Sequence, residues 1–345
     1  MGPDHLADLD HLAALPKVDL HRHLEGSVRL STIIDLARRA GVAPPAATPE
    51  DLARTATITR PVTGLEEALA AFAPFQSSFR SLDAVRRIAR EAVEDLDADN
   101  VRLAELRFSP AFMCGPAGLD WDAAMDAVVT GTEEARAAGA DVAVGLICIV
   151  SRDLGLEAAG ETVAFALAHG DRLVGFDIAG PEIAFPPAMW VDVVGPIREA
   201  GMHLTTHYGE SGPPAYCRDA IEGLGTERLG HGVSVAGDPA VTRLAADRGV
   251  ALEMCPTSNW LTQAVPTVDE HPARPLLHEG VRVTINTDNP GLMGIDLTNE
   301  YRLARTAMGF SHDDLRAVAR DALDASFLPS GVKTDVRRRH FAWAD

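Results

Sequence analysis

The chain is poor in basic residues. Among 345 residues, 31 lysines and arginines stand against 50 aspartates and glutamates, which gives a formal net charge of -19. So acidic a surface repels phosphate backbones and anionic lipids. The sequence therefore predicts that neither a nucleic-acid polymer nor a membrane is a partner, whereas a small neutral substrate is compatible with this charge.

Cysteines and long apolar runs are also scarce. The four cysteines form no C-x-x-C pair and are far apart in the chain, which argues against a zinc ribbon and a disulfide framework. No apolar run approaches the roughly 18 residues that span a bilayer. Residues 1–15 carry three aspartates instead of the basic and apolar regions of a signal peptide. We expect a cytoplasmic enzyme.

The sequence does contain a regular alternation of short apolar or β-branched runs with alanine-rich segments. Helical spacing of apolar residues predicts helices between the runs, for example at residues 82–96 and 121–138. Strict alternation of strand and helix indicates a parallel sheet. The eight predicted strands are residues 18–21, 101–108, 142–150, 173–178, 202–206, 228–230, 250–254 and 281–286.

Eight such units predict the α/β class and a (β/α)8 TIM-type barrel, formed by a single domain over residues 1–345. Counting units alone leaves an open doubly wound sheet as an alternative. Residues 39–80 are too long for a simple connection and contain five prolines, which predicts an extra helical segment after the first strand. Such a segment could cover the site. The last residues, 333–345, are expected to pack as a tail.

Polar side chains gather where the predicted strands end, which is where a barrel carries its chemistry. The first strand ends in His21-Arg22-His23, and strand alternation places both imidazoles on one face, with Arg22 directed toward the helices. These two residues alone fit one core and one surface histidine equally well. His207 and Asp288, at the ends of the fifth and eighth strands, add a third imidazole and a carboxylate. This set favours a zinc site with room for a reactive water.

Two further residues stand at strand ends in the same region. Glu210 follows His207 by three positions and is interpreted as an acid/base group beside the metal. His231 lies between Gly230 and Gly232, which lets the backbone approach a ligand closely. Cys255 has no neighbouring base and is interpreted as a packing residue. Helix, loop or surface positions are expected for the remaining histidines: His5, His11, His169, His203, His271, His278 and His340.

Five segments together resemble the adenosine/adenine deaminase family of the amidohydrolase superfamily. They occur in the family's order, span about residues 15–303, and are specific only in combination. They are residues 16–26 (PKVDLHRHLEG), 207–210 (HYGE), 230–232 (GHG), 255–259 (CPTSN) and 286–288 (NTD).

The resemblance implies a barrel with one zinc ion held by His21, His23, His207 and Asp288. The metal would lower the pKa of a bound water, and the resulting hydroxide would attack C6 of a 6-aminopurine. Two-metal members of the superfamily usually carry a bridging lysine at the end of the fourth strand. Residues 176–180 contain none, which fits a single ion.

The resemblance also assigns the catalytic residues Glu210, His231 and Asp288. Glu210 would protonate the ring nitrogen N1. His231 would orient the water and assist its proton, and Asp288 would ligate the metal and accept a hydrogen bond. Ammonia then leaves and a 6-oxopurine remains.

Four residues are the expected substrate contacts. His23 would border the substrate as well as the metal, and the backbone amide of Gly180 would meet the purine N3. Glu25 occupies the position of an acidic residue that contacts the ribose 5′-hydroxyl. Asn289 stands where the family commonly has an aspartate facing the purine N7. Because N7 only accepts hydrogen bonds, the NH2 group of an amide can donate to it at any pH.

The chain departs from the family at Asn289, at Pro181-Glu182 and at Tyr208, all expected near the base or sugar pocket. The first expectation for the substrate is adenosine or 2′-deoxyadenosine. Free adenine, or a 5′-modified adenosine such as aminodeoxyfutalosine, is the alternative with the same chemistry. Hydrolysis of an amide or ester is a third possibility. A non-catalytic binding protein would require degraded catalytic positions, yet Glu210, His231 and Asp288 are all present.

Overall fold

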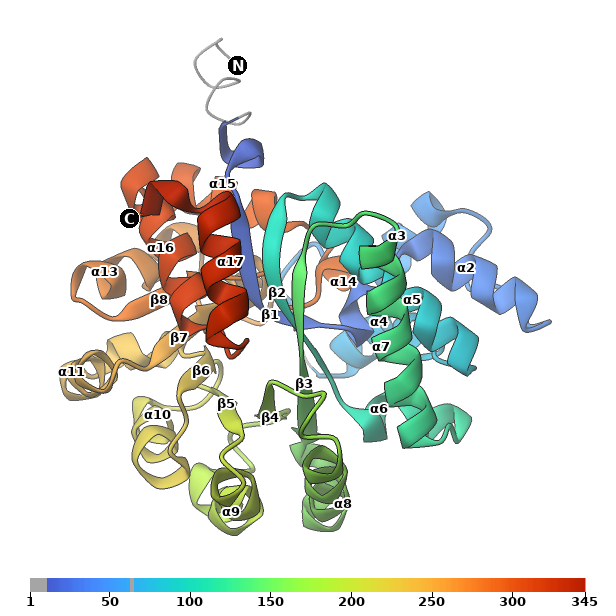
Figure 1. Ribbon diagram of the computed structural model, residues 1–345, viewed down its shortest axis with the longest axis horizontal. Coiled ribbons are helices and arrows are strands. Elements are labelled where there is room, and N and C mark those ends of the chain that lie inside the picture. Colours follow the sequence, from blue (N-terminus) through green and yellow to red (C-terminus); the bar gives the residue numbers. More distant parts are fainter. Residues whose placement is uncertain (1–10, 63–64, 345) are drawn as a thin grey trace.

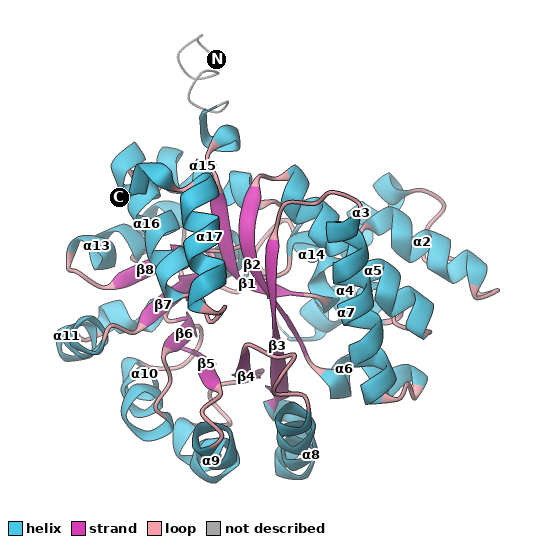
Figure 2. Cartoon of the chain, viewed as in Figure 1, coloured by secondary structure: helices cyan, strands magenta, loops and turns pink. Residues whose placement is uncertain are grey.

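The computed structural model describes residues 11–62 and 65–344 of the chain (Figure 1). His5 and most of residues 1–15, for which no signal peptide is expected, lie outside these residues. Strands occupy the middle of the molecule and helices surround them (Figure 2). Of the helices in the described ranges, none combines the length and the apolar character that crossing a bilayer requires.

Eight parallel strands pair in the order in which they occur in the sequence. The last strand meets the first through the N–H of His23, which donates to the carbonyl of Asp288, and the N–H of Asp288, which donates to the carbonyl of His21 (2.8 Å each). The predicted barrel and all eight predicted strands are confirmed. The strands are β1 Lys17–His23, β2 Val101–Phe108, β3 Ala143–Ser151, β4 Gly175–Ala179, β5 His203–Tyr208, β6 Arg228–His231, β7 Ala251–Met254 and β8 Arg282–Ile285.

Helices follow most strands and begin and end where the local sequence provides caps. Ser81 and Asp120 accept backbone N–H groups at the starts of α5 and α7, and Gly249 ends α11 with a left-handed φ of 65°. The α-helices are α2 Leu30–Arg39, α3 Pro49–Ala56, α4 Leu65–Gln76, α5 Leu82–Ala98, α6 Pro110–Cys114, α7 Trp121–Ala137, α8 Gly155–Ala168, α9 Val191–Glu199, α10 Pro214–Asp219, α11 Pro239–Arg248, α12 Pro256–Leu261, α13 Ala273–His278, α14 Pro290–Met293, α15 Leu297–Thr306, α16 His312–Ala325 and α17 Ser330–His340. The shorter helical turns are η1 Glu25–Ser27, η2 Gly115–Ala117, η3 Arg152–Leu154, η4 Pro187–Trp190, η5 Ala220–Leu224, η6 Val233–Gly237, η7 Val268–Glu270 and η8 Ala342–Ala344.

The extra helical segment predicted for residues 39–80 is present as α3 and α4, which lie between α2 and α5. Part of it lies against the helices that follow β7 and β8. The N–H of Val62 donates to Leu261 at the end of α12, and the N–H of Ile58 donates to Leu292 in α14 (2.9 Å each). The segment is therefore tied to the end of the barrel where the predicted site residues stand. At the other end of the chain, α17 packs through buried Val336, as expected of a tail.

The barrel interior contains buried charges as well as apolar side chains. Arg107 forms ion pairs with Asp177 and Glu253 (2.8 Å each), and Arg228 pairs with Glu105 (2.5 Å) and Glu253 (2.7 Å). All five side chains are essentially without solvent exposure. Removing one member would leave an uncompensated charge, which costs about 3–5 kcal/mol. This network lies directly beneath the strand ends that form the site.

Candidate active site

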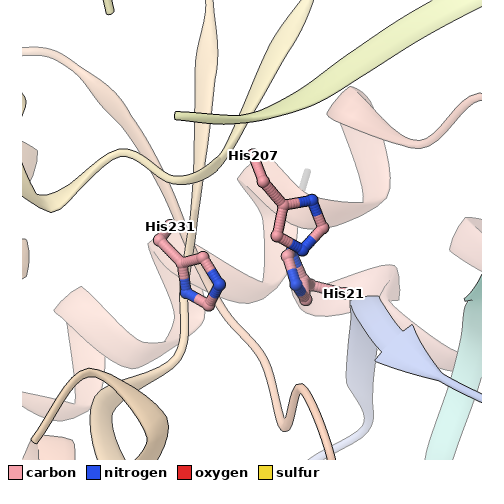
Figure 3. A group of neighbouring side chains, drawn as sticks. All are labelled: His21, His207 and His231. Atoms are coloured by element: carbon pink, nitrogen blue, oxygen red, sulfur yellow. The ribbon is translucent and has the colours of Figure 1, made fainter. Parts of the chain in front are cut away.

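The predicted ligands converge at the carboxyl ends of the strands. His21 and His23 come from β1, His207 from β5, and Asp288 follows β8. The Nε2 atom of His23 lies 3.2 Å from Nε2 of His207 and 3.3 Å from Oδ1 of Asp288, and Nε2 of His21 lies 3.6 Å from the same oxygen. The ring of His231, from β6, joins this group, and Figure 3 shows it close to His21 and His207.

Buried carboxylates orient two of the imidazoles. Nδ1 of His21 lies 2.7 Å from Oε2 of Glu253, and Nδ1 of His207 lies 3.1 Å from Oδ1 of Asp177. Each Nδ1–H donates to its carboxylate, so the Nε2 lone pair faces the other ligands. Arg107 bonds both carboxylates. Burial raises the pKa of Asp177, but His207 and Arg107 outweigh this effect and hold that pKa well below its usual range.

The donor set fits a metal ion. Nε2 of His21 is buried and has no hydrogen-bond partner among the residues that the structure describes. Burial lowers the pKa of His21 to about 4 and the pKa of His23 well below its usual value, so both rings are neutral at pH 7 and their lone pairs are free to bind a metal. Nε2 of His23 and Nε2 of His207 are only 3.2 Å apart, so a single cation can contact both nitrogens. Asp288 supplies the negative charge.

Backbone strain is concentrated at two of these residues. Among the described residues other than glycine, only four have a left-handed φ, and two of them are His231 (62°) and Asp288 (60°). A Cβ atom on Gly230 would lie 3.0 Å from the ring of His207. Gly230 therefore makes room for the ring of His207. From the sequence, this glycine had been expected to let the backbone approach a ligand.

Glu210 stands beside His231 on a loop held by Glu182. Oε2 of Glu210 lies 3.5 Å from Nε2 of His231, and its side chain is 24% exposed, open to a ligand. The buried Glu182 carboxylate accepts four successive backbone N–H groups. Oε2 accepts from Gly209 (2.8 Å) and Gly212 (3.0 Å), and Oε1 accepts from Glu210 (2.9 Å) and Ser211 (3.0 Å). Glu182 thus fixes the backbone position of Glu210.

Comparison with known proteins places this arrangement in a family. A profile described as "Adenosine deaminase" matches residues 16–341. The chain belongs to the adenosine deaminase family. It is 36% identical over 327 residues to an adenosine deaminase of Klebsiella pneumoniae, covering 95% of this chain and 98% of that one. It is 38% identical over 319 residues to an adenosine deaminase of Shewanella loihica, covering 91% and 95%. The predicted family and the predicted hydrolytic deaminase class are confirmed.

Solved structures agree with this assignment. An adenine deaminase from Arthrobacter aurescens superposes with a TM-score of 0.87 at 25% identity, covering 96% of this chain and 99% of that chain. An amidohydrolase from Burkholderia ambifaria with bound Zn gives 0.88 at 27%, covering 100% and 94%. An N6-methyl-AMP deaminase from Arabidopsis thaliana gives 0.83 at 28%, covering 97% and 98%. A metal site in this member of the adenosine deaminase family is consistent with the zinc-containing neighbour.

Of the expected substrate contacts in this family member, Glu25 offers an unused acceptor. Its Oε1 accepts the N–H of Ser109 (2.7 Å), while its Oε2 is buried without a hydrogen-bond partner in the described part of the chain. Burial raises the pKa of Glu25 to about 7. Gly180 follows β4 with a left-handed φ of 100°, a conformation that favours glycine.

Asn289 and Tyr208 each make a contact that the sequence did not predict. Nδ2 of Asn289 donates to Oδ1 of Asp288 (2.7 Å), so the amide orients this carboxylate. Tyr208 is buried on the opposite face of β5 from His207, where its hydroxyl donates to the carbonyl of Phe185 (3.0 Å). The expectation that Tyr208 lies near the base or sugar is therefore wrong, since strand alternation turns it toward the helices.

Sequence reasoning missed the residues that orient the candidate ligands. Asp177, Glu253 and Arg107 lie inside predicted strands, where only their charge in an apolar context could have drawn attention. His271 was interpreted as an ordinary helix, loop or surface histidine. It does lie in a loop, but it is 3% exposed, and its Nε2 bonds Asn259 (3.0 Å), whose amide contacts His231. Cys255 is a packing residue as expected, and burial raises its pKa well above the usual value.

Proposed function

We propose that the chain hydrolyses the 6-amino group of a purine nucleoside, converting adenosine or 2′-deoxyadenosine to inosine or 2′-deoxyinosine plus ammonia, with one zinc ion. The observation that carries the proposal is the convergence of three imidazoles, Asp288, His231 and Glu210 at the mouth of the barrel. Membership of the adenosine deaminase family supports it. Three imidazole nitrogens and one carboxylate oxygen are a ligand set that zinc prefers.

His21, His23, His207 and Asp288 would hold this ion. When bound, zinc supplies a Lewis acid that lets water act as a nucleophile near neutral pH. The carboxylates of Glu253 and Asp177 keep the rings of His21 and His207 in the tautomer that presents Nε2.

Side chains of the protein carry out the other catalytic steps. When water adds to C6, the displaced electron pair moves onto the ring nitrogen N1, which must receive a proton. Glu210 is the proposed donor of that proton, because its partly exposed carboxyl group at the edge of the cluster is accessible to a bound purine. His231, 3.5 Å from Glu210, orients the attacking water, and Asp288 accepts a hydrogen bond from it and takes the proton that the water loses on adding to C6. The C6–N bond then breaks, and the amino group takes up this proton and leaves as ammonia. The proton of the new C6 hydroxyl returns to Glu210, so that C6 becomes a carbonyl.

Glu25 favours a substrate that carries a sugar over a free base. Its buried Oε2 has no partner among the described residues, which is costly unless a ligand hydroxyl bonds to it, and a ribose 5′-hydroxyl is the group that the family places there. The backbone amide of Gly180 would meet N3, Asn289 would donate to N7 and His23 would border the purine. The Klebsiella and Shewanella relatives, both adenosine deaminases, support the same substrate class.

Free adenine or a 5′-modified adenosine is the second candidate. The likeness to an adenine deaminase and to an N6-methyl-AMP deaminase favours it, since those proteins share the fold and bear other substrate names. The departures at Asn289 and Pro181-Glu182 lie beside the residues that would contact the base.

A deamination panel tests the proposal. Ammonia release is measured with adenosine, 2′-deoxyadenosine, adenine, AMP and a 5′-thioadenosine, together with the metal content of the purified protein. We expect the highest kcat/KM for adenosine or 2′-deoxyadenosine and one zinc per chain. Glu25→Ala should lower kcat/KM at least tenfold for adenosine and much less for adenine. Glu199→Ala, at an exposed site on α9, should leave both unchanged. A preference for adenine or for a 5′-modified substrate would overturn the nucleoside assignment.

A further inference from the structure

A chain of buried hydrogen bonds lies behind His231 and is not used by the mechanism above. It joins His271, in the loop after η7, to Asn259 in α12 and then to His231. The three residues are 3%, 0% and 2% exposed. In such a buried chain each donor must meet an acceptor, because a mismatched pair leaves a polar group unsatisfied.

The chain of bonds begins at a backbone donor. The N–H of Ala273 donates to Nδ1 of His271 (3.2 Å). A backbone N–H has only one role, so this Nδ1 is an acceptor and the proton of the neutral ring is on Nε2. Burial lowers the pKa of His271 to about 3, which keeps the ring neutral at pH 7. His271 therefore presents an Nε2–H donor to Asn259.

Two donors fix the orientation of the Asn259 amide. The N–H of Cys255 lies 3.1 Å from Oδ1 of Asn259, and Nε2 of His271 lies 3.0 Å from the same atom. An oxygen is required there, because an NH2 group would face two N–H groups. The NH2 group is thereby left facing Nδ1 of His231 at 3.0 Å. An amide NH2 only donates, so Nδ1 of His231 must accept.

We propose that His271 and Asn259 are positioning residues that fix neutral His231 as its Nε2–H tautomer, so that His231 meets the reacting water as a hydrogen-bond donor. The Nε2 atom of His231 is the ring nitrogen that faces Glu210. A ring in this tautomer has no lone pair on the side of the site. It orients the oxygen of the water and is not the group that takes a proton from it. The role in catalysis rests on the proposed function, whereas the tautomer itself does not.

The tautomer is measured directly by long-range ¹H–¹⁵N correlation spectra of the zinc-loaded, ¹⁵N-histidine-labelled full chain. His231→Gln and His271→Gln assign the two rings. We expect both rings to carry the proton on Nε2. An Nδ1–H pattern for His231 in the unaltered protein overturns the inference, whatever the activity. Failure to deaminate any purine would instead overturn the proposed function and leave the tautomer as measured.

Asn259→Asp tests the link between Asn259 and His231. The carboxylate can accept from Cys255 and His271 as before, but it also demands a proton on Nδ1 of His231. We expect the His231 signals to change to an Nδ1-protonated pattern and kcat to fall at least tenfold at unchanged zinc content. An unchanged His231 pattern in the folded variant refutes the link.

Substitutions of His271 distinguish a role in positioning His231 from a role in packing. They also test the proposal if the Asn259→Asp variant does not fold. His271→Gln retains an N–H donor toward Asn259 and should keep the Nε2–H pattern of His231 and most of kcat. His271→Leu has similar bulk without a donor, and should leave His231 as a mixture of tautomers with reduced kcat. His278→Gln, on an exposed histidine of α13, is the matched control and should change neither. Equal behaviour of the Gln and Leu variants contradicts a positioning role.

Discussion

Replacing Glu182 by glutamine tests whether a buried carboxylate positions Glu210, the proposed catalytic acid. The substitution keeps the size of the side chain and removes one acceptor oxygen. Two of the four N–H groups from residues 209–212 would then face an NH2 group instead of an oxygen. The loop must either tolerate these mismatches or move.

The structure sets the scale of the effect. A hydrogen bond to a charged group contributes roughly 1.5–3 kcal/mol, so holding the loop in place without two of them costs about 3–6 kcal/mol. The loop can avoid much of this cost by moving toward solvent, since Glu210 is already partly exposed. Such a movement takes Glu210 away from the ring nitrogen. We expect kcat to fall by about 10²–10³, within the 10²–10⁴ typical of a lost general acid.

The assay is kcat for adenosine from the loss of absorbance, with metal content and urea unfolding measured on the same preparations. Zinc binding should persist, because His207 precedes the loop and Asp177 holds its ring. Asp99→Asn is the matched control. Asp99 also accepts backbone N–H groups, from Leu297 (2.7 Å) and Thr298 (3.2 Å), but it precedes β2, away from the strand ends that form the site. It should lower stability and leave kcat unchanged.

A Glu182→Gln variant with the kcat of the unaltered protein would refute this reasoning. So would a loss of kcat accompanied by an equal loss of zinc, because the effect would then act through the metal ligands and not through Glu210.

Two further predictions concern pH and the metal. Burial raises the pKa of Glu300 to about 7, so the folded protein keeps this proton where the unfolded chain loses it. The stability it contributes is full below about pH 4.5 and is lost as the pH rises through 7. We therefore compare the unfolding free energies of Glu300→Gln and the unaltered protein by urea titration. The difference between them should change by about 3 kcal/mol from pH 4.5 to pH 8, and a difference that stays constant with pH would contradict this. Removing the metal with a chelator should lower the unfolding free energy by at least ~2.7 kcal/mol relative to zinc at 100 times its Kd. His21→Ala should show no such response, and an equal response would place the metal elsewhere.

The strands and the convergence of the candidate ligands could be predicted because each depends on local sequence. A β-branched or apolar run specifies a strand, and the polar residue that follows it must lie at the carboxyl end. His207 and Asp288 could be placed this way, together with the family motifs that include them. The extra helices of residues 39–80 were predicted from length and proline content alone.

The supporting residues could not be predicted, because their roles depend on register and on distant neighbours. His21 meets Glu253 across 232 positions in the sequence, and nothing local marks Glu253 as the partner. Glu182 looked like a departure from the family pattern, and only the folded loop shows that four backbone amides meet it. Tyr208 was predicted to lie near the pocket because it follows His207 in the sequence, although adjacent strand residues face opposite sides of the sheet.

The seam between β1 and β8 has a consequence for how the site is assembled. His21 and Asp288 exchange backbone hydrogen bonds across it, so the cluster unites residues from near both ends of the chain. During synthesis the cluster stays incomplete until residue 288 has left the ribosome, by which time most of the barrel has emerged. With the proposed ligand set, metal uptake would therefore be a late event in the synthesis of the chain. A bound ion would link β1 to the residues after β8, and a permuted chain with new termini elsewhere would acquire it in a different order.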